Sequence, residues 1–308
     1  MAIQEHVQCD LCGSCEYSVI WDKAIRYREG LISEEHRLIF DQASGEVLNA
    51  RNVMCNKCGL VHINPRMSEA ALHDWYKESY RATYGIDLRG EELHAQYALK
   101  YLAGKGILPG KGRYLDVGCS TGVLVEAIGK VGFSPYGIEQ SEETAHIAQS
   151  KGLSVELGCV EEYKSAPFQL ITILNTLEHM YSPRKVLDKL WTLLDDEGVL
   201  LIIVPDLCNN NIMITVDGFL SNAHLYTFDL YTIIQYARVT GYSIVCIDKQ
   251  SEFNMSKFYI ILRKGKVRDL LIDYHPDINQ KRSLLLAADT IMSEQMKMLQ
   301  YFKDTKVK

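Results

Sequence analysis

Residues 114–122 read YLDVGCSTG, a short apolar run that ends in a turn of glycines and small polar residues. A glycine has no side chain, so the backbone at Gly118 and Gly122 can closely approach another backbone or a ligand. An ordinary turn between a strand and a helix is the alternative interpretation, because glycine is common wherever chains reverse. The residues on both sides of the turn decide between the two.

Strands and helices alternate along the chain around this turn. Strands are expected at 113–118, 134–139, 153–158, 168–175 and 199–205, and helices at 122–132, 141–152 and 182–198. This rhythm predicts βαβ units and a mainly parallel sheet whose apolar strands are buried on both faces. Two later strands, 242–249 and 256–265, have no helix between them, so we expect an antiparallel pair at the sheet edge.

The turn is therefore expected at the carboxyl edge of the sheet, where open α/β sheets bind ligands. The next strand ends in Glu139, roughly twenty residues further on, where an acid accepts hydrogen bonds from both ribose hydroxyls of a nucleoside. A surface glutamate kept for solubility is the alternative interpretation of Glu139. Together the turn and the acid favour a nucleoside cofactor at this edge.

Residues 113–205 resemble the core of the class I S-adenosylmethionine-dependent methyltransferases. The matching motifs are LDVGCSTG (115–122), GIEQS (137–141), ILNTLEHMYSP (173–183) and LLDDEGVLLIIVPD (193–206). A dinucleotide-dependent dehydrogenase, the nearest rival, would need G-x-G-x-x-G, whose second glycine is missing here. The resemblance implies an α/β fold with a Rossmann-like, seven-stranded, mainly parallel sheet, S-adenosylmethionine as cofactor, and methyl transfer.

The segments 55–76 and 221–242 resemble those flanking this core in bacterial methyltransferases that act on sugars, polysaccharides or natural products. This implies a small hydroxylated or keto acceptor, such as a sugar, a nucleotide-linked sugar or a glycan. A zinc-ribbon RNA methyltransferase is one alternative, but the formal net charge of −6 and the absence of an Asn-Pro-Pro-aromatic motif for a flipped base argue against nucleic acid. A noncatalytic cofactor-binding subunit is another, opposed by the intact glycine and ribose positions.

The resemblance also assigns the cofactor contacts. Asp116 would organise the turn, Glu139 would hold the ribose, and Asn175 would lie near the amino-acid end of the cofactor. Cys159 stands where an acid usually binds the adenine amine, so that contact would fall to the Val160 backbone or to Glu161, because a thiol is a weak partner. The implied cofactor-binding residues are Asp116, Gly118, Cys119, Ser120, Gly122, Glu139, Gln140, Cys159, Val160 and Asn175.

Three residues are candidates for acid–base chemistry: His224, Tyr226 and His179. His224 follows the fifth strand and could remove the proton of an attacking oxygen, because imidazole titrates near neutral pH. For carbon methylation, His224 and Tyr226 could instead deprotonate a carbon beside a ketone and stabilise the enolate. His179, in a Glu-His pair with Glu178, is more typical of architecture than of catalysis, and His224 could simply cap a helix that begins near Thr227.

Two C-x-x-C pairs, Cys9 with Cys12 and Cys55 with Cys58, predict a closed, structural Zn²⁺ site of four thiolates. A hairpin over 36–55, turning near Ser44–Gly45, is expected to join the pairs. Cys15 could replace one ligand. Buried free cysteines are the alternative interpretation, and a redox role is supported less, because neither pair follows a strand and opens a helix.

The chain as a whole has 308 residues, 47% hydrophobic and 23% charged, and no run near the roughly 18 apolar residues of a membrane helix. The N-terminus lacks the features of a secretory signal, so we expect a cytoplasmic protein. The expected division is a zinc-ribbon-like domain (1–65), connecting helices (66–108), the methyltransferase domain (109–264) and a C-terminal helical extension (265–308). That extension carries an amphipathic stripe, at Leu284, Ala288, Ile291, Gln295, Leu299 and Phe302. The stripe could dock on the chain's own core or contact a second copy, and we favour a homodimer.

Overall fold

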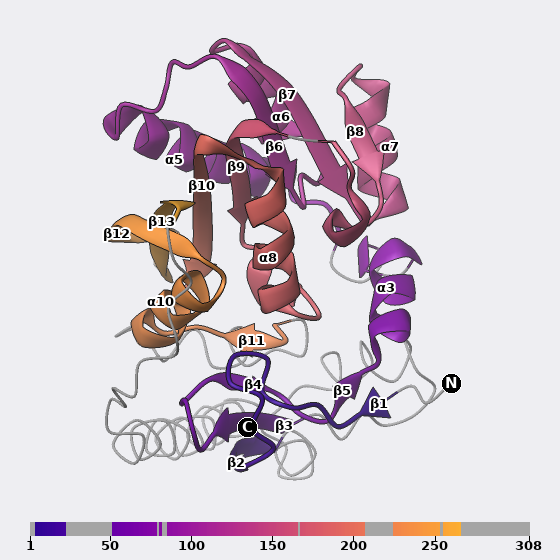
Figure 1. Cartoon of the computed structure of the whole chain (residues 1–308). Coiled ribbons are helices and arrows are strands. Elements are labelled where there is room, and N and C mark those ends of the chain that lie inside the picture. Colours follow the sequence, from indigo (N-terminus) through magenta and orange to yellow (C-terminus); the bar gives the residue numbers. More distant parts are fainter. Residues whose placement is uncertain are drawn as a thin grey trace, which may run out of the picture.

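Seven strands form the central sheet of the computed structural model, in the order β12-β13-β10-β9-β6-β7-β8 (Figure 1). The structure describes residues 4–22, 51–78, 80–81, 85–165, 167–206, 224–252 and 255–265. The strands are β6 (Gly112–Val117), β7 (Phe133–Glu139), β8 (Val155–Leu157), β9 (Phe168–Leu174), β10 (Leu194–Pro205), β12 (Tyr242–Glu252) and β13 (Met255–Lys264). Strands β8, β7, β6, β9 and β10 run parallel to one another, and β13 pairs antiparallel with both β10 and β12. The predicted Rossmann-like sheet and its antiparallel edge pair are confirmed.

Helices cover both faces of this sheet. The helices are α3 (Glu69–Glu78), α5 (Leu88–Gly104), α6 (Val123–Gly129), α7 (Glu142–Ser150), α8 (Pro183–Leu193) and α10 (Leu230–Val239), with short 3-10 turns η1 (Val160–Glu162) and η2 (Leu177–His179). Tyr114 and Leu170 belong to the apolar cluster that includes α5 and α6. The next residues, Leu115 and Ile171, belong to the cluster that includes α8 and α10. This alternation explains the continuous apolar runs, because both sides of each central strand are buried.

Helix α8 ends earlier than the sequence predicts. The glycine at 198 indicated a helix through 182–198, but the helix stops at Leu193 and Leu194 already pairs with Phe168 of β9. An irregularity in the ladder follows before Val199. At Gly198 an added Cβ would lie 2.8 Å from the Phe168 carbonyl oxygen. This glycine therefore permits a close approach of two strands rather than ending a helix.

The two cysteine pairs lie in a small unit, residues 4–22 and 51–67, that we call the cysteine module. Its strands are β1 (Gln4–Glu5), β2 (Tyr17–Asp22), β3 (Arg51–Cys55), β4 (Val61–Ile63) and β5 (Arg66–Met67). Strand β3 pairs on one side with β2 and on the other with β4. The expected turn at Ser44–Gly45 lies outside the described residues, as do the C-terminal extension and its apolar stripe.

The cysteine module and the larger domain share one hydrophobic core. Strand β11 (Tyr226–Thr227), which follows the central strand β10 in the chain, pairs antiparallel with β4 and completes a four-stranded sheet (Figure 1). Leu11, Leu60 and Ile63 of the module belong to the same buried cluster as Phe228 and Tyr236. Among the described residues, no helix combines the length and the apolar composition that crossing a membrane requires.

Candidate active site

A cavity of about 920 Å³ opens at the carboxyl ends of β6, β7 and β9, where the sequence predicts a cofactor. Helices α3 and α5 contribute to its wall. Nine of the ten candidate cofactor residues line this cavity: Asp116, Gly118, Cys119, Ser120, Glu139, Gln140, Cys159, Val160 and Asn175. The fold thus gathers residues from four separate strand ends around one space.

Gly118 and Gly122 have different roles in the turn after β6. Gly118 has a φ of 72°, and a Cβ there would lie 2.6 Å from Cγ2 of Thr176, so only glycine lets β6 end this close to the loop after β9. Gly122 does not line the cavity. Its Cβ would lie 2.5 Å from Leu153 and 3.1 Å from Ala148, at the end of α7. The bare face of Gly122 therefore packs against protein, and its contact with the cofactor stays a prediction.

Glu139 is anchored at both carboxylate oxygens. Its Oε2 accepts a hydrogen bond from the backbone N–H of Ser120, and its Oε1 accepts one from that of Ser141, each at 2.8 Å. The side chain is buried, which raises its pKa, although the two backbone hydrogen bonds favour the charged form. A carboxylate oxygen can accept more than one hydrogen bond, so the anchored group can still accept from a diol.

Asp116 lies below the turn and bonds to the neighbouring strand. Its Oδ1 accepts a hydrogen bond of 2.6 Å from the Thr172 hydroxyl, and that hydroxyl lies 2.6 Å from the hydroxyl of Tyr114. Burial raises the pKa of Asp116 to about 7, while the bond from Thr172 opposes this shift. These contacts tie β6 to β9 just below the cavity.

Two residues of the cavity wall come from the region that the sequence indicates only as connecting helices. Nη2 of Arg81 donates to the Ser120 hydroxyl at 2.7 Å, and that hydroxyl donates to Oε1 of Glu91 at 2.7 Å. The Thr121 hydroxyl donates to Oε2 of Glu91 at 2.5 Å. Arg81 and Glu91 thereby brace the glycine turn from outside. No local motif marks them, because their role depends on where α5 packs.

Cys159 and Glu161 line the cavity around the adenine position that the sequence predicts. Cys159 is half-buried, and burial raises its pKa to about 12, so it remains a neutral thiol near pH 7. Glu161 lines the cavity too, and burial raises its pKa. The Val160 side chain is buried. Glu161 thus keeps an acidic group near the place where the family usually has one.

His179 and His224 meet near the cavity. His179, at the end of η2, lines it, and the His224 ring lies 4.7 Å from the His179 ring, centroid to centroid, at 78°. Glu178 is buried behind them, and neither of its carboxylate oxygens has a hydrogen-bond partner among the described residues. Burial raises the pKa of Glu178 to about 7, and the Lys257 charge opposes this shift. One Glu178 oxygen lies 4.0 Å from Nε2 of His179.

Tyr226 does not reach the cavity. It is 1% exposed, and its hydroxyl accepts a hydrogen bond of 2.7 Å from Arg66 and donates one of 3.0 Å to the Tyr181 carbonyl oxygen. Burial raises its pKa well above the ordinary value. The prediction that Tyr226 acts on substrate is therefore wrong, because β11 turns its side chain into the contact with the cysteine module.

The alternative role of His224 as a helix cap is also wrong. Helix α10 begins at Leu230 rather than near Thr227, and its N-cap is Asp229. The Asp229 carboxylate accepts a hydrogen bond of 2.7 Å from the Thr232 N–H, and Thr232 returns a bond to the Asp229 backbone, which is a capping box. His224 lies well before this helix and contacts His179 instead.

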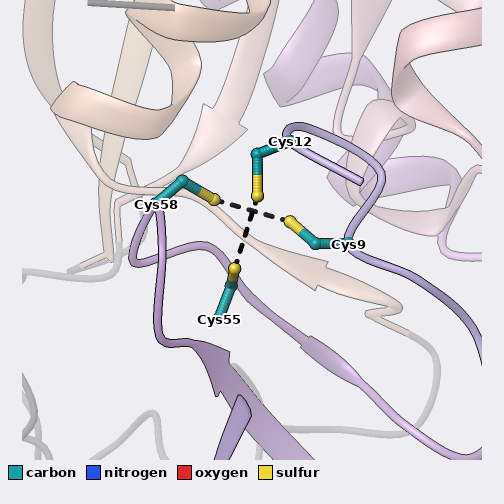
Figure 2. A group of neighbouring side chains, drawn as sticks. All are labelled: Cys9, Cys12, Cys55 and Cys58. Carbon is teal, nitrogen blue, oxygen red and sulfur yellow. Dashed lines mark hydrogen bonds between the residues drawn. The ribbon is translucent and has the colours of Figure 1, made fainter. Parts of the chain in front are cut away.

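The four cysteines of the predicted metal site converge (Figure 2). The Cys9 and Cys58 sulfurs lie 3.5 Å apart, as do those of Cys12 and Cys55, and all four lie within 4.8 Å of one another. In a tetrahedral site with Zn–S bonds of about 2.3 Å, the sulfurs lie about 3.8 Å apart. The residues present therefore fit such an ion. Cys15 is exposed and outside this group.

Comparison with known proteins agrees with this geometry. The profile of a family described as a methyltransferase domain matches residues 90–247. The ubiquinone biosynthesis O-methyltransferase of Thiobacillus denitrificans is 34% identical over 97 residues, 29% of this chain and 41% of that protein. Its counterpart in Xanthomonas campestris strain B100 is 28% identical over 156 residues, 45% of this chain and 64% of that protein. The chain thus spans less than two thirds of either relative.

A solved structure shares the fold. Magnesium protoporphyrin IX methyltransferase from Synechocystis PCC 6803, crystallised with bound S-adenosylhomocysteine, superposes with a TM-score of 0.51 at 18% identity. The superposition covers 64% of this chain and 100% of the other. Because the family profile matches half of the chain, from α5 to β12, this protein belongs to the class I S-adenosylmethionine-dependent methyltransferases.

Proposed function

We propose that this protein transfers the methyl group of S-adenosylmethionine to a small hydroxylated acceptor, with His224 as the base and His179 beside it. The observation that carries the proposal is one cavity lined by Glu139, the turn after β6 and His179, whose ring contacts the ring of His224. The cavity therefore offers one part that can bind a nucleoside, at Glu139, and another part where methyl transfer can take place, at His179. The cavity volume, about 920 Å³, is ample for a cofactor together with a small acceptor.

Glu139 and the turn would hold the cofactor. Glu139 would accept from the ribose hydroxyls, and Gly118 and Ser120 would lie against the methionine portion. When bound, the cofactor supplies an electrophilic methyl group on a sulfonium that is already a good leaving centre. The chain therefore has to position the acceptor and receive one proton, and positioning contributes much of the rate.

His224 is suited to receive the proton of an acceptor hydroxyl, because a neutral imidazole is a base near pH 7. Oxygen as the methylated atom is favoured by the relatives named O-methyltransferases. Methylation of a carbon beside a ketone would use Tyr226 to help stabilise the enolate. Tyr226 is not available for this role, because Arg66 donates a hydrogen bond to its hydroxyl. A sugar or glycan acceptor stays a prediction from the sequence resemblance.

The cysteine module would hold one Zn²⁺ through Cys9, Cys12, Cys55 and Cys58. Four thiolates leave no open position on a tetrahedral ion, so the ion would stabilise the module rather than take part in methyl transfer.

The test combines binding with product detection. Calorimetry with S-adenosylhomocysteine should show one site per chain, and mass spectrometry should then find methylated product among phenolic, sugar-nucleotide and glycan acceptors. RNA serves as the comparison substrate. The proposal fails if the cofactor does not bind at millimolar concentration, or if methyl groups appear on RNA and on none of the small acceptors.

A further inference from the structure

The histidine pair is carried by two short segments, and the cysteine module contacts both. We propose that Arg66 and Asp10 are positioning residues through which the cysteine module keeps His179 and His224 in place. The inference rests on the proposed function of that pair. It makes the module a working part of the active site rather than a separate domain beside it.

Arg66 joins the two segments directly. Its Nη2 donates to the Tyr181 carbonyl oxygen at 2.8 Å, and its Nη1 donates to the Tyr226 hydroxyl at 2.7 Å. The guanidinium carbon also lies 4.3 Å from the centre of the Tyr181 ring and 5.2 Å from that of Tyr226. Tyr181 comes two residues after His179, and Tyr226 two residues after His224. One side chain, 4% exposed, thus holds both segments.

Asp10, on the loop of the first cysteine pair, makes a second link. Its Oδ1 accepts a hydrogen bond of 2.5 Å from the Ser182 hydroxyl, and its Oδ2 accepts one of 3.0 Å from the backbone N–H of Arg184. The same Oδ2 accepts from the Tyr236 hydroxyl at 3.0 Å. Ser182 is the N-cap of α8, directly after the segment that carries His179. The loop that would wrap the metal therefore also fixes the start of α8.

The backbone provides a third link. Tyr226 pairs with His62 and Thr227 with Val61, and the N–H of Ile63 donates to the Leu225 carbonyl oxygen at 2.9 Å. The carbonyl that accepts this bond belongs to the residue next to His224. The strand that begins two residues after His224 is thus an edge strand of the four-stranded sheet.

Neither segment can hold its shape alone. His179 ends a 3-10 turn of three residues, and β11 has two residues, so each has few internal hydrogen bonds. Their order has to come from the groups packed against them. A displacement of about 1 Å in a catalytic group can cost about 100-fold in rate, so such positioning controls turnover.

The decisive experiment measures hydrogen exchange and kinetics together. The variants are Arg66→Met, which removes both bonds, and Tyr226→Phe, which removes only the hydroxyl. Ser18→Ala is the matched control, because its hydroxyl bonds to Asn56 within the module at 2.8 Å and to neither segment. Exchange is followed by mass spectrometry in peptides covering 176–182 and 224–229, with 112–128 as the reference peptide.

Arg66→Met should speed exchange about tenfold in the two histidine segments and leave 112–128 unchanged. The kcat for methyl transfer should fall about tenfold or more, while the Kd for S-adenosylhomocysteine stays within about twofold. Removal of the metal by a chelator should give the same local pattern of exchange. Tyr226→Phe should give a smaller change of the same kind, and Ser18→Ala none.

Unchanged exchange in both histidine segments would overturn the inference, and so would an equal rise in 112–128, which would indicate general loosening. If Arg66→Met does not fold, Tyr226→Phe decides by the same criteria. Exchange is independent of turnover, so a wild-type protein that methylates nothing would refute the proposed function while the link between the module and the segments is still tested.

Discussion

His179 and His224 lie on different segments of the chain, yet their rings are 4.7 Å apart at 78°. One follows β9 and the other lies between β10 and β11, so the tertiary structure brings them together. Beside them lies the buried carboxyl of Glu178.

Removal of either imidazole should affect turnover rather than cofactor binding. His224→Ala should lower kcat by about 10²- to 10⁴-fold, the usual contribution of a general base, and His179→Ala by less. Calorimetry should show cofactor affinity close to that of the wild type in both. His146→Ala, at an exposed site on α7, is the control and should keep full activity. Wild-type kcat in His224→Ala would exclude His224 as the base.

Glu139→Gln should weaken cofactor binding about 10- to 100-fold, because hydrogen bonds to a charged acceptor contribute about 1.5–3 kcal/mol. The amide also cannot accept from the Ser120 and Ser141 N–H groups at both of its ends. Titration calorimetry with S-adenosylhomocysteine measures the change. Glu143→Gln, an exposed acid on α7, should bind as the wild type does. Equal affinities for the two variants would contradict the ribose assignment.

Gly118→Ala should destabilise the fold more than Gly152→Ala. Both glycines have positive φ, 72° and 78°, so both substitutions carry the cost of about 1–2 kcal/mol for a left-handed residue. Only at Gly118 would the new methyl meet another group, Thr176 at 2.6 Å, whereas nothing lies within 4 Å of a Cβ at Gly152. The loss in free energy of unfolding should therefore be about 1–3 kcal/mol larger for Gly118→Ala than for Gly152→Ala. Denaturant unfolding of the two variants makes the comparison, and equal losses would be the contrary result.

Glu178 should make stability depend on pH. Its pKa is raised to about 7 by burial, against about 4.3 in an unfolded chain, so the folded state binds the proton more tightly. The resulting contribution is complete below about pH 4 and is lost as the pH rises through 7, a change of about 4 kcal/mol. Glu178→Gln stays neutral and should not show this loss.

The measurement for Glu178 is the free energy of unfolding at about pH 5 and pH 8 in the wild type and in Glu178→Gln. Asp116, whose pKa is also raised to about 7, titrates in both proteins, so the difference between them isolates Glu178. If the free energy of unfolding changes equally with pH in the wild type and in Glu178→Gln, the Glu178 carboxyl does not bind protons more tightly on folding.

The zinc content of the protein should depend on the cluster of Cys9, Cys12, Cys55 and Cys58. The purified protein should hold about one equivalent of zinc, and Cys55→Ser should hold less than about half of that and unfold at a lower temperature. Cys15→Ser, whose sulfur is exposed and outside the cluster, is the matched control and should keep its metal. Equal zinc in the two variants would point to a different ligand set.

Local patterns were sufficient to predict most of the central sheet. Val117 and Gly118 mark the end of a strand, and Glu139 marks the end of the next, because burial and turn formation depend mainly on neighbouring residues. The end of α8 was misplaced because Gly198 serves a contact between two strands, which no local pattern records. The spacing of the two C-x-x-C pairs predicted which four cysteines would form one cluster.

The sequence by itself determined the alternation of strands and helices, the glycine turn after the first central strand, and the two cysteine pairs, since each depends on residues close together in the chain. Tertiary structure alone decided that Gly122 faces α7, that Tyr226 turns toward Arg66, and that Arg81 and Glu91 reach the turn. These outcomes depend on how segments far apart in the chain pack, and side-chain directions there are set by contacts that spacing along the chain does not contain.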